Sequence, residues 1–142
     1  MKIFNLFPLT VMKDKIIVED KERNLLVSEI FKMKEQKYKN ENSNFAWTGD
    51  TKGYEFLFSN NVFKNLSNKI SKSILEYLKT LEVNTDLLEI YYQRSWATFT
   101  ENEQSINFHT HSQSNISFAY YLFKPQDSGG IIFRSNELQN EI

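Results

Sequence analysis

Both histidines of this chain lie in one short segment, Ile106-Asn107-Phe108-His109-Thr110-His111, with a single threonine between them. Successive side chains of an extended strand point to opposite faces, so Asn107, His109 and His111 would share one face. Two imidazoles on the same face can converge on one cation, and neutral imidazole is the commonest metal-binding side chain. The spacing therefore predicts a metal site with His109 and His111 as ligands.

The residue types around this pair restrict the chemistry that it could perform. Imidazole suits zinc, copper, iron and nickel, and open coordination positions beside few protein ligands are typical of non-haem Fe(II) oxygenases. Asn107 and Ser112 flank the pair and could supply hydrogen bonds to the ligands. The sequence contains no G-x-S-x-G, no H-E-x-x-H and no glycine-rich phosphate loop. The absence of cysteine excludes disulfides, thiolate zinc sites and cysteine nucleophiles.

Length and charge narrow the classes of protein further. The 142 residues allow one domain, 1–142, with a core of its own. A formal net charge of −1 argues against nucleic-acid binding, which usually shows a clustered basic excess. No apolar run approaches the roughly 18 residues of a membrane span, and the N-terminus does not read as a signal peptide. We therefore expect a cytoplasmic protein that binds neither nucleic acid nor membrane.

Two helices are predicted in the N-terminal half, where apolar residues recur at helical spacing. The first begins at Asp20 and runs to about Lys37. The second follows the cap candidates Ser59, Asn60 and Asn61 and carries one long apolar stripe. That stripe, which we interpret as core packing, consists of Phe63, Leu66, Ile70, Ile74, Tyr77, Leu78 and Leu81.

Beyond Thr85 the apolar pattern changes to a period of two, which is typical of strands. The predicted strands are residues 86–97, the histidine segment 106–111, 116–123 and 131–133, after two extended segments between Ile3 and Val18. Helices followed by antiparallel strands at short spacing indicate an α+β, mainly β fold, with a sandwich or barrel as its main body.

The chain resembles the Fe(II)- and 2-oxoglutarate-dependent oxygenases, in particular a bacterial, marine and phage group with an H-x-H motif. That group opens with Leu-Phe-Pro and continues with a helix, a Trp-containing strand, H-x-H, a Ser-Gly-x-Tyr-Tyr strand and a Gly before a short apolar strand. The matching segments here are Leu6-Phe7-Pro8, the helix from Asn61, Trp96-Ala97, His109-Thr110-His111, Ser117-Phe118-Ala119-Tyr120-Tyr121 and Gly129-Gly130-Ile131-Ile132-Phe133.

The resemblance implies a double-stranded β-helix, or jelly roll, that carries Fe(II) and 2-oxoglutarate and hydroxylates an unknown substrate. His109 matches the first metal ligand, and His111 stands where the family has a carboxylate. The family's distal histidine and its cosubstrate-binding basic residue have no counterpart, although Arg134 is a candidate for the latter role. We therefore expect a truncated jelly roll with an incomplete catalytic set, little turnover, and unpaired edges that favour pairing with another copy.

Several assignments have alternatives. Asn107, Trp96 and Tyr121 are candidates for lining the pocket, but Trp96 and Tyr121 also fit core positions, and Arg134 also fits a solvent-facing strand end. No catalytic residue beyond the ligands is assigned. A non-catalytic jelly-roll binding or assembly module is one alternative function. A cupin-like metal enzyme is another, and it would need a carboxylate such as Asp127 or Glu137 in the site.

Overall fold

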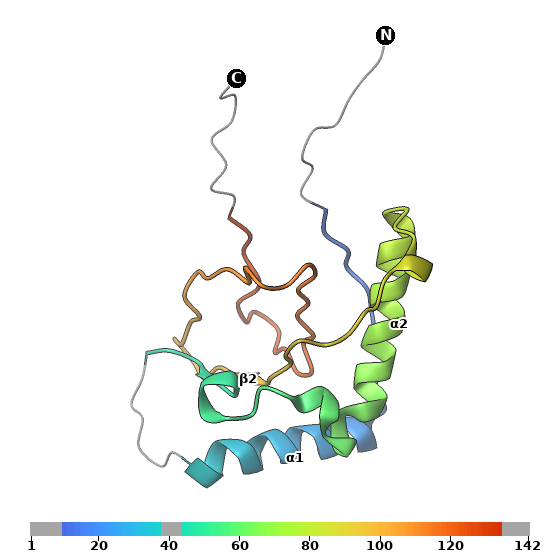
Figure 1. Ribbon diagram of the computed structural model, residues 1–142. Coiled ribbons are helices and arrows are strands. Elements are labelled where there is room, and N and C mark those ends of the chain that lie inside the picture. Colours follow the sequence, from blue (N-terminus) through green and yellow to red (C-terminus); the bar gives the residue numbers. More distant parts are fainter. Residues whose placement is uncertain (1–9, 38–43, 135–142) are drawn as a thin grey trace.

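The computed structural model describes residues 10–37 and 44–134 of the chain. Two helices dominate it: α1 lies along the bottom of Figure 1 and α2 rises at one side. In chain order the elements are α1 (Asp20–Lys37), β1 (Trp47–Thr48), the 3-10 turns η1 (Asp50–Lys52), η2 (Leu57–Ser59) and η3 (Asn61–Phe63), α2 (Lys64–Thr80), η4 (Thr85–Leu87) and β2 (Thr98–Phe99). The Leu6-Phe7-Pro8 segment and Glu137 lie outside the described residues.

Both helices that the periodicity predicts are confirmed. Asp20 and Glu22 place negative charge in the first turn of α1, where the helix dipole favours it. The Asn60 side chain accepts a hydrogen bond from the Val62 backbone N–H at 2.9 Å and so caps η3, which leads directly into α2. Since the caps and the apolar spacing agree, the helix boundaries fall close to the predicted ones.

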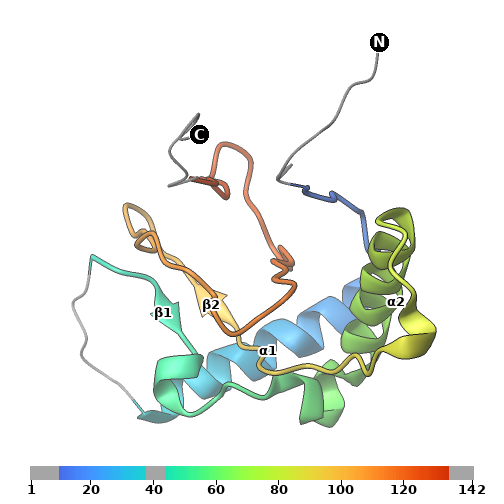
Figure 2. The ribbon, with the colours of Figure 1, turned by 45° about the horizontal axis from the view of Figure 1, so that its top comes forward.

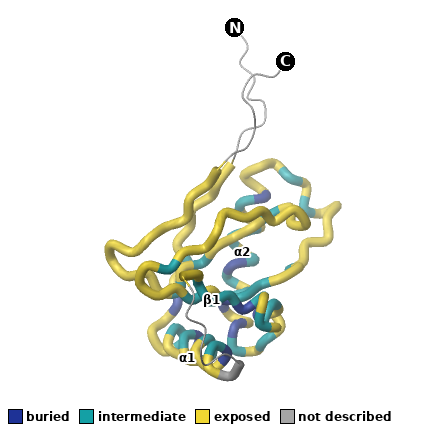
Figure 3. Tube along the Cα trace, turned by 90° about the vertical axis from the view of Figure 1, so that its left-hand side faces the viewer, coloured by how far each residue is buried: buried dark blue, intermediate teal, exposed yellow. Residues whose placement is uncertain are grey.

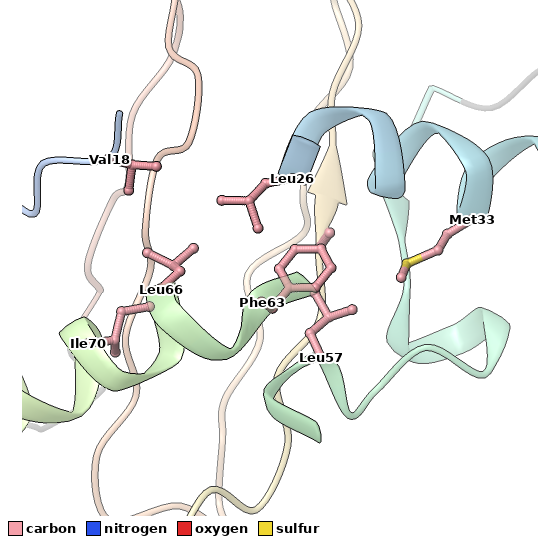
Figure 4. Packing of buried hydrophobic residues seen from close by; sticks show 8 residues of the cluster. Val18, Leu26, Met33, Leu57, Phe63, Leu66 and Ile70 are labelled. Carbon is pink, nitrogen blue, oxygen red and sulfur yellow. The ribbon is translucent and has the colours of Figure 1, made fainter. Parts of the chain in front are cut away.

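The core lies where α1, η2, η3 and the start of α2 meet (Figure 4). Leu26 of α1 is fully buried, and Phe63 packs between it and Leu57 of η2. Every buried side chain among the described residues is apolar, so the hydrophobic effect is the main force holding this corner together. The core cluster consists of Val18, Leu26, Met33, Leu57, Phe63, Leu66, Ile70 and Ala97.

The expectation of a mainly β fold built as a jelly roll is wrong. The described chain has a single sheet of two short antiparallel strands, in which Trp47 pairs with Phe99 and Thr48 with Thr98. The described residues after β2, 100–134, run as loops without further strands (Figure 2). Between residues 106 and 134 the backbone-to-backbone hydrogen bonds are the turn contacts Ser114 N–H to His111 O and Ser128 N–H to Pro125 O. Alternating apolar residues therefore occur here without the hydrogen-bonded ladder that defines a sheet.

Side chains hold the C-terminal half together in place of a ladder. Tyr92 meets Phe118 edge to face with ring centroids 6.0 Å apart, and the Ser114 hydroxyl donates to the Gln93 side-chain oxygen at 3.1 Å. Further along, Trp96 faces His111. As the residue number rises from 92 to 96, the number of the contacted residue falls from 118 to 111. The two segments therefore run antiparallel, and the contacts between them are made by side chains. Residues 111–118 are mostly exposed, whereas residues 92–96 include three half-buried positions. Figure 3 shows that the buried residues gather at the helices.

Across the ranges that the structure describes, no helix combines the length and the apolar character needed to cross a membrane.

Candidate metal centre

The histidine segment, residues 106–111, is held at both ends by backbone hydrogen bonds. At its start, the Ala46 N–H donates to Ser105 O at 3.1 Å, next to a parallel bridge between Phe45 and Ser105. At its end, the Ser114 N–H donates to His111 O at 3.0 Å and closes a turn. The first contact joins the start of the segment to the residues before β1, and the second closes the turn that follows His111.

The two imidazoles come together as their spacing predicts. The Nε2 atoms of His109 and His111 are 3.2 Å apart. Their rings meet nearly at right angles, with an interplanar angle of 82° and centroids 4.8 Å apart. Both side chains are exposed, so the pair is open to water and to solutes.

A backbone carbonyl orients one of the rings. His109 Nδ1 lies 2.8 Å from Asn107 O. Because a carbonyl oxygen only accepts, His109 Nδ1 must carry the hydrogen, and its Nε2 then presents a lone pair in the neutral ring. In the metal-free protein His111 can donate its Nε2 hydrogen to that lone pair. Metal-binding histidines typically use their second nitrogen in this way, which fixes both the tautomer and the ring direction.

The distance between the two nitrogens fits a shared metal ion. Zn–N bonds are about 2.0–2.1 Å, so two nitrogens on one zinc stand about 2.9 Å apart at an octahedral right angle and about 3.3 Å apart at the tetrahedral angle. The observed Nε2 separation of 3.2 Å lies between these values. The pair could therefore occupy two adjacent positions of one metal once His111 Nε2 has lost its hydrogen and both lone pairs face the ion.

Trp96, one of the predicted pocket residues, lies beside the His111 ring. Its ring lies 5.8 Å from that of His111, tilted by 44°. Because Trp96 is half-buried, it gives the exposed His111 ring a fixed surface to rest against.

The other predicted site residues, Asn107, Arg134 and Tyr121, do not place their side chains against the two imidazoles. Asn107 contributes its main-chain oxygen to the pair. The Arg134 guanidinium lies 4.0 Å from the centre of the Phe108 ring, a cation–π contact one residue away from His109. Tyr121 is exposed, and no ring or hydrogen-bond contact within the described residues joins it to either histidine.

A third protein ligand is missing from the described part of the chain. Among those residues no three His, Cys, Asp or Glu side chains gather closely enough to hold a metal ion. Residues 104–123 contain no Asp, Glu, Lys or Arg, so no carboxylate lies near the pair in sequence. The described residues thus supply ligands for two coordination positions of one metal. They do not assemble the complete facial triad expected of the oxygenase family.

Sequence reasoning missed two features of the site. The acceptor for His109 is the carbonyl of Asn107, which any residue could supply, so no residue type signals it. The contact of Trp96 with His111 depends on how two segments pack. The signal available was the period-two pattern of residues 86–97, which places Trp96 at the end of an extended segment.

Shifted pKa values occur away from the pair. Burial raises the pKa of the Tyr92 hydroxyl, although a hydrogen bond with Ser71 works in the opposite direction. Burial also raises the pKa of Tyr120, whose hydroxyl donates to Ile16 O at 3.2 Å. Tyr92 anchors its loop to α2 and Tyr120 anchors its loop to the segment before α1, so we assign both a structural role.

No protein-family model, curated protein or solved structure matches this chain. Family membership therefore gives no support to the oxygenase, dioxygenase and 2-oxoglutarate terms of the sequence interpretation. The jelly-roll and double-stranded β-helix terms are wrong, because the described fold is mostly helical with one two-stranded sheet.

Proposed function

We propose that this protein binds a divalent transition-metal ion through His109 and His111. The observation that carries the proposal is the approach of the two Nε2 atoms to 3.2 Å. The hydrogen bond from His109 Nδ1 to Asn107 O supports it, since it leaves Nε2 as the nitrogen with a free lone pair in the neutral ring. Exposure of both rings lets a hydrated ion reach the nitrogens directly.

The Fe(II)- and 2-oxoglutarate-dependent oxygenase activity stays a proposal that rests on the sequence resemblance around the H-x-H motif. When bound, iron and its cosubstrate would supply the oxidising chemistry for hydroxylation of an unknown substrate. The residues of this chain would hold the metal through His109 and His111, with Trp96 covering one side. Because the described residues supply only two ligands, we expect weak binding and little turnover. A cytoplasmic location likewise stays a prediction.

Isothermal titration with Ni²⁺ tests metal binding. We expect one class of site in the wild-type protein, with the affinity falling in His109→Ala and His111→Ala by at least the roughly 10–100-fold seen when a ligand's hydrogen-bond partner is removed. Gln113→Ala is the matched control, because Gln113 is an exposed residue of the adjacent turn. Wild-type affinity in both histidine variants would contradict the proposal.

A second assay addresses the oxygenase proposal separately. Succinate formed from 2-oxoglutarate with Fe(II) should be low but above background for the wild-type chain and should fall to background in His109→Ala. Succinate formation that is robust and lost in His109→Ala would contradict the expected low turnover while supporting the metal site. Metal binding without any succinate favours the alternative of a non-catalytic binding or assembly module.

A further inference from the structure

The histidine pair has the geometry of half a metal site. Two nitrogens 3.2 Å apart supply one edge of a coordination tetrahedron, and zinc normally takes four ligands. Among the described residues of the same chain, no carboxylate, thiol or further imidazole lies close enough to act as a third ligand. Both imidazoles are exposed, so ligands can reach the open side of the metal from another molecule.

The backbone of residues 106–111 is also open to pairing. None of its N–H groups donates to a carbonyl elsewhere on the described backbone. Natural proteins protect such edges with charged side chains, especially lysine. The surrounding stretch 104–123 carries no charged side chain at all. This segment therefore has both the N–H groups without a partner on the described backbone and the lack of charge that favour strand-to-strand association.

A second copy of the segment would complete the site by symmetry. If two copies pair antiparallel with Thr110 on the twofold axis, His109 of each copy stands opposite His111 of the other. Because side chains alternate along a strand, the four imidazoles then share one face of the ribbon. Residues opposite one another have Cα atoms about 4.5–5.5 Å apart, which lets the four rings approach a single ion.

We propose that zinc joins two copies of this chain through a four-histidine site made by His109 and His111 of each copy, with residues 109–111 paired antiparallel about Thr110. The inference rests on the proposed metal binding and adds the partner that completes the coordination. The metal bonds would offset the loss of translational and rotational freedom on association.

Sedimentation velocity of the full chain, with zinc and with a chelator, tests the assembly. We expect a monomer with the chelator and a mass twice as large with zinc, at one zinc ion per two chains. His109→Ala and His111→Ala should stay monomeric at the same zinc concentration, whereas Gln113→Ala should dimerise like the wild type. One zinc per monomer would overturn the dimer and leave the proposed function standing. No zinc binding would overturn both, and a dimer that persists with the chelator would overturn zinc as the link.

A cross-link tests the register. The chain has no cysteine, so Thr110→Cys introduces a single thiol. With Thr110 on the axis, the two thiols stand within the Cα separation that a disulfide spans, about 4.4–6.8 Å. We expect diamide to cross-link Thr110→Cys in the presence of zinc and much less with the chelator. Gln113→Cys is the control, since Gln113 lies in the turn beyond the paired residues and its two copies would stand at opposite ends of the pairing. Equal cross-linking of both variants would overturn the register.

Cobalt reports the coordination independently of folding and mass. Co²⁺ absorbs visible light much more strongly in a tetrahedral site than in an octahedral one. We expect a four-histidine site to be tetrahedral and a histidine pair completed by water to be octahedral. We expect the strong tetrahedral spectrum in the dimer. A weak octahedral spectrum in a sample that remains monomeric would overturn the four-histidine assignment.

Discussion

Trp96 is placed to report metal binding at His111. The two rings are 5.8 Å apart, and paramagnetic ions such as Ni²⁺ and Cu²⁺ quench nearby indole fluorescence. We predict that Ni²⁺ quenches the fluorescence of the wild-type protein in a saturable titration and that His111→Ala abolishes this response. The chain has one other tryptophan, Trp47, which pairs with Phe99 in the sheet. Trp47→Phe should keep the quenching, and equal quenching in His111→Ala would contradict the assigned site.

Tyr92 links the loop region to α2 through its hydroxyl. That group donates to Ser67 O at 2.7 Å and lies 2.9 Å from the Ser71 hydroxyl, while its ring stacks on Phe58. We predict that Tyr92→Phe lowers the free energy of unfolding by about 0.5–1.5 kcal/mol at neutral pH, the usual net value of one hydrogen bond. Urea denaturation measures this loss, and an unchanged midpoint would show that the contact does not stabilise the fold.

The raised pKa of Tyr92 also has a consequence at high pH. Burial favours the neutral phenol, so the folded-state pKa lies above its value in the unfolded chain. Stability from this group is therefore complete below the unfolded pKa of about 10 and is lost as the pH rises through the folded value. Tyr92→Phe should show a shallower decline of stability with alkaline pH than the wild type. Tyr120, shifted in the same direction, should preserve part of that decline.

At the scale of elements, two adjacent leucines of α1 differ sharply in how far they are buried. Leu26 is 0% exposed and Leu25 is 53% exposed. We predict that Leu26→Ala costs about 2–5 kcal/mol of unfolding free energy, because it leaves a cavity against Phe63 and Leu57. Leu25→Ala removes the same atoms from an exposed site and should cost under about 1 kcal/mol. Chemical denaturation of the two variants compares them directly, and equal losses would contradict the packing of α1.

Helices were predictable from this sequence, and strands were not. The backbone hydrogen bonds of α2 join residues within the same helix, so its apolar stripe and the Asn60 cap carry the information needed. A strand at residues 86–97 needs a partner elsewhere in the chain, and alternation alone does not specify one. For the same reason the meeting of His109 with His111 followed from local spacing, whereas the contact between Trp96 and His111 did not.

At the scale of the whole molecule, the packed helices and the exposed C-terminal half should differ in their resistance to proteolysis. Tyr91 and Phe123 are largely exposed, while Phe63 is buried in the core. We predict that chymotrypsin cuts first after exposed aromatic residues beyond Thr85, because cleavage needs accessible, locally open backbone. Mass spectrometry of a time course identifies the cuts. Early cleavage after Phe63 would contradict the described packing.

The central claim, that two imidazoles converge on one cation, is tested most directly by imidazole-selective proton–nitrogen NMR during a zinc titration. The chain has only two histidines, so its spectrum contains two sets of ring signals. Before zinc is added, His109 should show the hydrogen on Nδ1, as its bond to Asn107 O requires. With zinc, the Nε2 signals of both rings should shift together over the same range of added metal. A response from only one ring, or from neither, would contradict the shared site.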